Sequence, residues 1–418
     1  MKSSRFMVWG VVLAAILVLP LQSTAADRGT SGKWIATWAA SPQAPFGGPG
    51  GGLVVEGQTI RERARVSVGG SHLRLRLSNE YCSRPLVLGA VTVGRPLDPA
   101  TVAEGSLRQV TFGGRDSITV PPGAPIVSDA LDFAVKAGEE ISISIFLPEK
   151  VQSPTEHNLG LRTAIITPPG DFTRQTQVQA AARIESMLLV TAITVPAKAG
   201  QKLVVAFGDS ITDGNTSTVD AERNWPGNFL RRLRSKGLGD SIALVNHGIG
   251  GNQLLKDGAG QSALARFDRD VLGLPGVTHV IILEGINDIG WPGARLGDFE
   301  LAPLSALPAA GDLIGAYRQM IERAHEHGIK VIGSTLTPFK GTDAPGYYMD
   351  SKEPIRQAVN EWIRTSGAFD AVIDWDRTLR DPADPQRMLP RYAARDNLHP
   401  SDEGYQAMAD ALDPKLFR

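Results

Sequence analysis

The chain has 418 residues, of which 42% are hydrophobic and 21% charged, and its formal net charge is -1. This composition is ordinary for a globular protein. Because the charges balance, there is no basic surplus to attract nucleic acid or an anionic lipid surface. At roughly 100–200 residues per domain, the length predicts two domains once any leader has been removed.

The first 26 residues have the layout of a secretory signal peptide. A short basic start is followed by an apolar run over residues 6–21 and by small residues at 23–26. The run is roughly 16 residues long, shorter than the ~20 that a helix needs to span a bilayer. We therefore expect cleavage after Ala25 or Ala26, a secreted or periplasmic protein, and no stable membrane insertion. An uncleaved membrane anchor is the alternative.

Residues 27–195 are predicted to form an N-terminal β-domain. Three runs alternate between apolar and polar residues, with glycine and proline turns around them: 63–68, 72–77 and 141–146. A strand over 72–77 would bury its three leucines and turn Arg74 and Arg76 to solvent. Many short strands separated by turns predict an all-β sandwich or jelly roll.

The single cysteine, Cys82, cannot form an internal disulfide. We expect it to be a small buried residue of a strand, with a reactive thiol as the alternative. No cluster of cysteine and histidine has the spacing of a zinc site, so we expect no metal and no cofactor.

From residue 196 to 418, strands and helices are predicted to alternate. Continuous apolar runs are typical of strands covered on both faces, and apolar stripes at helical spacing indicate helices. The strands are expected over 202–207, 242–245, 277–283, 330–336 and 371–374, and the helices from about 225 and over 312–327, 354–365 and 402–412. This alternation predicts a parallel sheet with helices on both faces, with ligands bound beyond the carboxyl ends of the strands.

Four polar segments lie where such a sheet would place a site: Gly208–Thr212, Asn246–Asn252, Glu284–Asp288 and Asp396–Pro400. They hold the residue types that acyl transfer needs. A serine hydroxyl is a weak nucleophile until a base takes its proton, and a neutral imidazole can do so near physiological pH. Ser210 and His399 are therefore the candidate nucleophile and base. Asp396, three residues before His399, is the candidate carboxylate that orients the imidazole.

The oxyanion that develops during acyl transfer needs fixed hydrogen-bond donors. The candidates are the backbone N–H groups of Ser210 and Gly251 and the side-chain amide of Asn287. Glycine suits a point where the backbone must approach the substrate closely. Removing one such donor typically costs ~3 kcal/mol of barrier.

These segments resemble the four blocks of the SGNH (GDSL-type) hydrolases: Gly-Asp-Ser after a strand, the glycine of the second segment, Gly-x-Asn-Asp, and Asp-x-x-His. The resemblance covers about residues 200–418, and Ile211 stands where the family usually has leucine. It implies a flavodoxin-like three-layer αβα fold and an esterase, lipase, thioesterase or carbohydrate O-deacetylase activity. It also implies the roles given above for Ser210, Gly251, Asn287, Asp396 and His399.

A second resemblance lies near the start of the chain. Residues 34–42, with the sequence WIATWAASP, resemble the opening of a secreted two-domain branch of this family, in which a β-domain precedes the hydrolase. We expect Trp34 and Trp38 to pack in the domain interface, with contact to a sugar as the alternative.

Two other serine hydrolase classes fit less well. A chymotrypsin-like protease would be all-β, with its histidine upstream of the serine, and the Gly-x-Ser-x-Gly elbow of α/β-hydrolases is interrupted by Thr212. We therefore predict a secreted serine esterase that cleaves small-molecule or polysaccharide esters, including O-acyl or O-acetyl groups on carbohydrate. The alternatives are a lipase or lysophospholipase-type acylhydrolase, and an acyltransferase with a glycan-binding N-terminal module.

Overall fold

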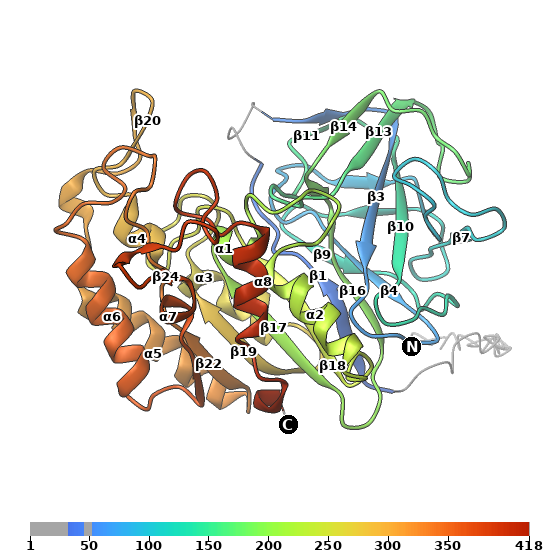
Figure 1. The fold of residues 1–418 in the computed structure, drawn as a ribbon. Coiled ribbons are helices and arrows are strands. Elements are labelled where there is room, and N and C mark those ends of the chain that lie inside the picture. Colours follow the sequence, from blue (N-terminus) through green and yellow to red (C-terminus); the bar gives the residue numbers. More distant parts are fainter. Residues whose placement is uncertain (1–31, 46–51, 418) are drawn as a thin grey trace, which may run out of the picture. The chain divides into compact units, whose positions relative to one another are not determined.

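The structure is a computed structural model that describes residues 32–45 and 52–417. The predicted signal peptide, residues 1–26, lies outside the described residues. Antiparallel strands fill the chain up to Pro196, and a parallel sheet with helices follows from Lys202 (Figure 1). We refer to residues 32–196 as the β-region and to residues 197–417 as the α/β region. Within the described ranges, no helix has the length and hydrophobicity needed to cross a bilayer.

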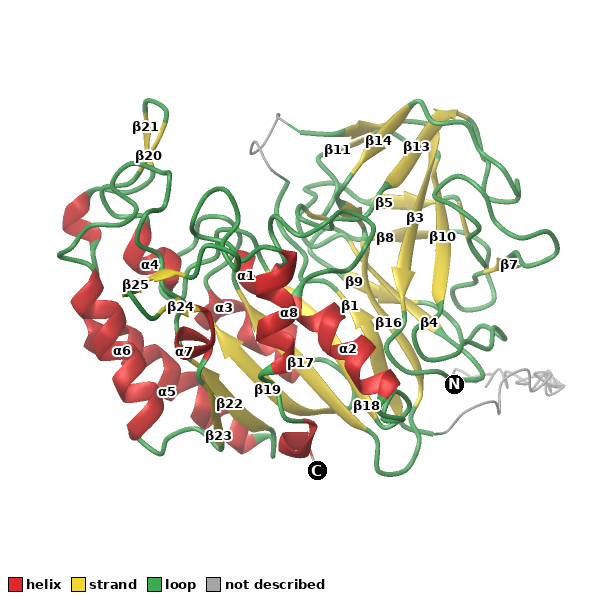
Figure 2. Cartoon of the chain, viewed as in Figure 1, coloured by secondary structure: helices red, strands yellow, loops and turns green. Residues whose placement is uncertain are grey.

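The β-region has sixteen strands: β1 (Trp34–Ala39), β2 (Val54–Val55), β3 (Gln58–Arg65), β4 (Arg74–Ser78), β5 (Leu86–Leu88), β6 (Ala90–Gly94), β7 (Arg108–Gln109), β8 (Ile118–Val120), β9 (Pro125–Val127), β10 (Glu140–Leu147), β11 (Val151–Gln152), β12 (Glu156–His157), β13 (Ala164–Pro169), β14 (Ala182–Ile184), β15 (Met187–Leu188) and β16 (Val190–Pro196), counted over the described residues. One sheet has the order β1-β16-β4-β9 and another β14-β13-β3-β10-β6-β7. The pairs β2–β11, β12–β15 and β5–β8 complete the region. Its strands are drawn in yellow in Figure 2. The prediction of an all-β N-terminal region is confirmed.

The alternation predicted over 72–77 holds for the leucines and fails for the arginines. Leu73, Leu75 and Leu77 are fully buried, as expected. Arg74 is half-buried because its guanidinium lies 4.2 Å from the ring centre of Trp34. The apolar stem of an arginine packs readily on an aromatic ring, so an alternating pattern does not guarantee that the polar residue faces solvent.

Cys82 corrects a second expectation. It lies in the loop between β4 and β5 and is half-buried, so its placement in a strand is wrong. Its thiol contacts the backbone oxygen of Ser153 at 3.4 Å. Burial raises the pKa of the Cys82 thiol, which disfavours the reactive thiolate.

The α/β region is built on a parallel sheet with the strand order β18-β17-β19-β22-β23. Its strands are β17 (Lys202–Gly208), β18 (Ile242–Gly248), β19 (Val277–Leu283), β22 (Lys330–Ser334) and β23 (Ala371–Ile373), and the small hairpins are β20 (Arg295–Leu296) with β21 (Phe299–Glu300), and β24 (Arg380–Asp381) with β25 (Asp384–Met388). Counted along the sheet, the order is 2-1-3-4-5, which is that of flavodoxin-like folds. The predicted fold class is confirmed, and the predicted strands differ from the observed ones only at their ends.

Helices flank this sheet on both faces (Figure 1). They are α1 (Ser210–Asp213), α2 (Trp225–Ser235), α3 (Ala263–Phe267) continued by the π-helix η1 (Asp268–Leu272), α4 (Ile286–Gly290), the short η2 (Leu304–Ala306), α5 (Ala310–Glu326), α6 (Glu353–Thr365), α7 (Trp375–Leu379), α8 (Asp402–Asp410) and η3 (Pro414–Phe417). Phe207 of β17 meets Phe267 of α3 edge-on, with ring centres 5.4 Å apart. Trp225 of α2 packs against Trp375 of α7 at 4.9 Å. These buried aromatic pairs pack α3 against the sheet and α2 against α7.

Candidate active site

The carboxyl ends of three neighbouring strands bring the predicted site segments to one edge of the parallel sheet. Gly208 of β17 is level with Gly248 of β18 and with Leu283 of β19. A Cβ atom at Gly208 would lie 2.2 Å from the backbone oxygen of Leu283. A glycine is therefore required where the chain leaves β17. The residues that follow these strands meet at the same edge, as the sequence predicts.

Ser210 opens the short helix α1 directly after this turn. Asp209 caps the helix, because its Oδ1 accepts the backbone N–H of Ile211 at 2.9 Å. This contact gives Asp209 a local structural role. Ser210 is only 5% exposed, so its hydroxyl faces neighbouring side chains more than bulk water.

The three predicted triad residues lie in one chain of hydrogen bonds. Ser210 Oγ lies 2.8 Å from His399 Nε2, and His399 Nδ1 lies 2.6 Å from Asp396 Oδ2. A carboxylate at Nδ1 favours the tautomer in which Nε2 is free to accept the serine proton. Asp396 Oδ1 also accepts the backbone N–H groups of Leu398 and His399, both at 3.0 Å. Burial raises the pKa of Asp396, but the hydrogen bonds and the attraction of His399 outweigh it and lower that pKa to about 2. Asp396 is therefore a carboxylate at neutral pH.

Asn215 is a neighbour of the imidazole that the sequence does not reveal. Its amide nitrogen lies 3.3 Å from Nε2 and 3.4 Å from Nδ1 of His399. The nearly equal distances place the amide beside the ring. Tyr405 holds this part of the chain, because its hydroxyl donates to the backbone oxygen of Asn215 at 2.7 Å.

The amide of Asn287 is held in one orientation by three partners. Its Oδ1 accepts the indole N–H of Trp291 at 3.1 Å and the hydroxyl of Tyr347 at 2.8 Å. Its Nδ2 donates to the backbone oxygen of Asn252 at 2.8 Å. An amide nitrogen has two hydrogens, so one N–H remains for a further acceptor. No sequence pattern points to Trp291 or Tyr347 as the residues that orient this amide.

The other two candidate donors are backbone N–H groups. The described residues offer no hydrogen-bond acceptor to the N–H of Ser210 or to that of Gly251. Gly251 has a φ of 74°, in the left-handed region that favours glycine. A Cβ atom there would also lie 3.0 Å from Ala259 and 3.1 Å from Trp291. Both the backbone conformation and the close neighbours therefore favour glycine at this position.

Below the site lies a cluster of buried acids. Burial raises the pKa of Asp209 to about 7 and that of Asp288 to about 6, and it places the pKa of Glu284 well above its usual range. The guanidinium of Arg266 is 3.6 Å from Glu284 and moderates the shift. Because raised pKa values shift these acids towards their protonated forms, the cluster carries less negative charge at neutral pH than its composition suggests. In the described ranges, no group of three or more histidine, cysteine, aspartate or glutamate side chains is arranged to hold a metal.

The chain is similar to several known proteins. The family described as GDSL-like Lipase/Acylhydrolase matches residues 206–407. Similar solved structures include a GDSL-like lipase from Bacteroides thetaiotaomicron, with 21% identity, a TM-score of 0.37 and coverage of 51% of this chain and 87% of that one. An acetyl xylan esterase has 22% identity, a TM-score of 0.36 and coverage of 50% and 96%. A psychrotrophic esterase from a Pseudoalteromonas species has 15% identity, a TM-score of 0.36 and coverage of 50% and 94%. No curated protein matches the chain.

Proposed function

We propose that this chain, whose residues 206–407 belong to the GDSL-like lipase/acylhydrolase family, hydrolyses carboxylic esters through an acyl intermediate on Ser210. Membership of that family makes it a carboxylic ester hydrolase. The observation that carries the serine mechanism is the pair of contacts at His399: Nε2 lies 2.8 Å from Ser210 Oγ, and Nδ1 lies 2.6 Å from Asp396.

In the proposed acylation step, Ser210 Oγ attacks the ester carbonyl while its proton passes to His399 Nε2. Asp396 stabilises the imidazolium that forms. The carbonyl oxygen becomes an oxyanion, which accepts hydrogen bonds from the N–H groups of Ser210 and Gly251 and from the free N–H of Asn287. His399 then returns the proton to the leaving alcohol, the ester C–O bond breaks, and the acyl group remains on Ser210.

Deacylation uses the same groups with water as the nucleophile. His399 takes a proton from a water molecule as the water attacks the acyl carbonyl, and the same three donors hold the second oxyanion. Collapse breaks the acyl bond to Ser210, which regains its proton from His399, and a carboxylic acid leaves. An acyltransferase would use a sugar hydroxyl in place of water.

The expected substrates are acyl or acetyl esters of carbohydrates or small alcohols. The signal-peptide layout of residues 1–26 supports export, where polysaccharide esters are accessible. We therefore propose a secreted or periplasmic location. Lipase or lysophospholipase-type activity on long-chain esters is the alternative.

The test is Ser210→Ala in the full chain, assayed with acetyl, butyryl and long-chain chromogenic esters. We expect turnover to fall at least about a thousandfold while the melting temperature stays close to that of the wild type. Ser235→Ala, at an exposed serine of α2, is the matched control and should keep full activity. Retained turnover by Ser210→Ala would falsify the mechanism. An added sugar acceptor, compared with water alone, separates transfer from hydrolysis.

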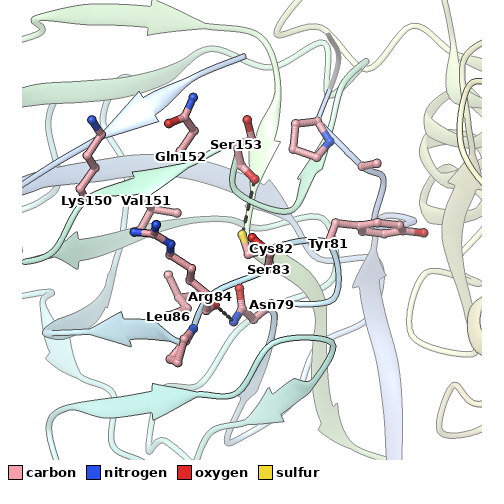
Figure 3. A pocket seen from close by; sticks show the side chains of 13 residues that line it. Asn79, Tyr81, Cys82, Ser83, Arg84, Leu86, Lys150, Val151, Gln152 and Ser153 are labelled. Carbon is pink, nitrogen blue, oxygen red and sulfur yellow. Dashed lines mark hydrogen bonds between the residues drawn. The ribbon is translucent and has the colours of Figure 1, made fainter. Parts of the chain in front are cut away.

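A second candidate function, glycan binding by the β-region, is favoured by a cavity of about 570 Å³ (Figure 3). Arg84 and Lys150, the charged residues that line it, are both basic, so it suits an acidic sugar better than a neutral one. The ring of Tyr81 points away from them, and its hydroxyl accepts from Arg269 at 2.8 Å. Ser210→Ala protein should be retained by a polyuronate and lose retention with Arg84→Ala added. Equal retention on neutral xylan would argue against this site.

A further inference from the structure

His157 of β12 is a buried histidine of the β-region that contacts the α/β region. Its Nε2 lies 3.0 Å from Asp213 Oδ1, and its Nδ1 lies 3.0 Å from the backbone oxygen of Ser41. His157 is 6% exposed and Asp213 is 4% exposed. The contact therefore joins the two regions of the chain out of reach of bulk solvent.

Both nitrogens of His157 must carry a hydrogen. A backbone carbonyl oxygen can only accept a hydrogen bond, and so can an ionised carboxylate. The ring facing these two acceptors is thus an imidazolium. Burial lowers the pKa of His157, but the attraction of Asp213 and the two hydrogen bonds outweigh it, so the pKa lies above the ordinary histidine value.

Asp213 connects this imidazolium to the helix that carries Ser210 and to the turn that carries Gly251. It is the last residue of α1, the helix that Ser210 opens. Its second oxygen, Oδ2, accepts the backbone N–H of Gly250 at 3.1 Å. Gly250 immediately precedes Gly251, whose N–H is a proposed oxyanion donor.

The β-region also packs directly against this turn. A Cβ atom at Gly250 would lie 2.4 Å from Leu159 Cδ1, so the Leu159 side chain covers the glycine. We propose that His157 is a positioning residue for the esterase reaction: as an imidazolium it holds Asp213, and through Asp213 it fixes the Gly250–Gly251 turn relative to Ser210. This inference rests on the proposed function, because the turn matters to the rate only if its N–H binds the oxyanion.

A second set of contacts ties the loop after α1 to the β-region. Arg63 Nη2 lies 2.6 Å from Asp220, and Arg65 Nε lies 2.8 Å from Glu222. Asp220 and Glu222 both have positive φ values, of 61° and 50°. Such a backbone persists only when its surroundings hold it. The same loop carries Asn215, which lies beside His399.

The environment of His157 sets the direction of its pH response. Besides Asp213, the charged and titratable groups that face it are Arg266 of α3 and His247 of β18. Burial lowers the pKa of His247 to about 3, so His247 stays neutral and does not compete for Asp213. Since the pKa of His157 is raised, its imidazolium contacts are complete below the ordinary histidine value of ~6.5 and are lost as the pH rises through the higher folded-state value.

The test compares His157→Gln with His327→Gln, the same change at an exposed histidine, in the full chain. We expect His157→Gln to lower kcat about tenfold to a hundredfold and to change KM by no more than about twofold. The reason is that a displaced Gly251 N–H would stabilise the transition state less well. Inactivation of Ser210 by a phosphonate ester, which forms a similar oxyanion, should slow by a similar factor. The wild type should lose kcat on the alkaline side, and His157→Gln should lack that alkaline limb. His327→Gln should match the wild type throughout.

The outcomes separate this inference from the proposed function. If Ser210→Ala keeps its turnover, the proposed function fails, whatever His157 does. If Ser210→Ala is inactive but His157→Gln has the kcat, alkaline limb and phosphonate rate of His327→Gln, the positioning role is overturned alone, even with a lowered melting temperature. If His157→Gln does not fold, Asp213→Asn takes its place, since an amide keeps one acceptor for two partners. A folded Asp213→Asn protein with wild-type kcat overturns the inference as well.

Discussion

The α/β region and the β-region relate to the site in different ways. In the α/β region, three residues of the proposed site follow strand ends: Ser210 follows β17, Gly251 follows β18 and Asn287 follows β19, while Asp396 and His399 share the loop before α8. In the β-region, the residues that help to hold Asp213 in place are scattered along the chain, as Ser41 and His157 show. Residues that take part in the reaction must be of a particular type at a fixed place on the edge of the sheet, so they form motifs that can be recognised in the sequence. Residues that support the site need only one suitable contact each, so they form no recognisable motif.

The largest effect should come from Asp396→Asn in the α/β region. An amide cannot stabilise the imidazolium, and it can hold the wrong tautomer of His399, so we expect kcat to fall roughly 10³–10⁴-fold. Steady-state kinetics on a short-chain ester measures this, with Asp410→Asn, at an exposed position of α8, as the matched control. A loss of less than about tenfold would show that Asp396 does not take part in the reaction.

The contrast also explains how much of the molecule can be predicted from its sequence. The strand predicted over 277–283 coincides with β19, because its apolar residues are followed directly by the polar segment that begins at Glu284. Asp396 and His399 lie three residues apart, so a single loop presents both to Ser210. Fold class and reacting groups are thus encoded locally.

What escapes prediction depends on contacts between distant parts of the chain. The orientation of Asn287 is set by Tyr347, 60 residues later. The Asp213 contact of His157 spans 56 residues. The alternation shows only which side of the strand Arg74 occupies. It does not show that Trp34 covers that side, so the sequence predicts exposure where the structure has a contact. Such pairs follow from tertiary packing, which residue spacing does not specify.

The next largest effect should come from Asn287→Ala. This change removes one proposed oxyanion donor, so kcat should fall about 10²–10³-fold with a small change in KM. It also leaves the hydroxyl of Tyr347 without its acceptor, so the melting temperature needs to be measured alongside. Tyr347→Phe is the control, because it removes that hydroxyl and keeps the amide. If both variants lose the same activity, Asn287 acts through packing, and the distinction between reacting and supporting groups blurs.

A smaller effect is expected from Arg63→Gln, which breaks the ion pair with Asp220 across the two regions. The pair is partly exposed, since the carboxylate side chain is 34% accessible, so solvent weakens it. We expect about 0.5–1 kcal/mol of coupling in a double-mutant cycle with Asp220→Asn. The kcat should fall only a few-fold, because Asn215 lies in the same loop. A loss as large as that of Asn287→Ala would show that the β-region does more than support the site.

The smallest effect on catalysis is expected from Glu62→Gln, a buried residue of β3. One oxygen of Glu62 accepts the backbone N–H of Leu188 at 2.9 Å, and the other has no partner among the described residues. Burial raises the pKa of Glu62 to about 8, against ~4.3 for an ordinary glutamate. The protonated form therefore stabilises the fold fully below about pH 4, and that contribution is lost as the pH rises towards 8.

Glutamine cannot ionise, so Glu62→Gln should become more stable relative to the wild type as the pH rises from 5 to 9, while kcat stays unchanged. Urea unfolding at several pH values measures the difference in the free energy of unfolding, and its slope with pH is the diagnostic quantity. A constant offset between the two curves would mean that Glu62 is already ionised in the folded protein. A fall in kcat without a change in that slope would place Glu62 among the residues of the β-region that support the site, together with His157.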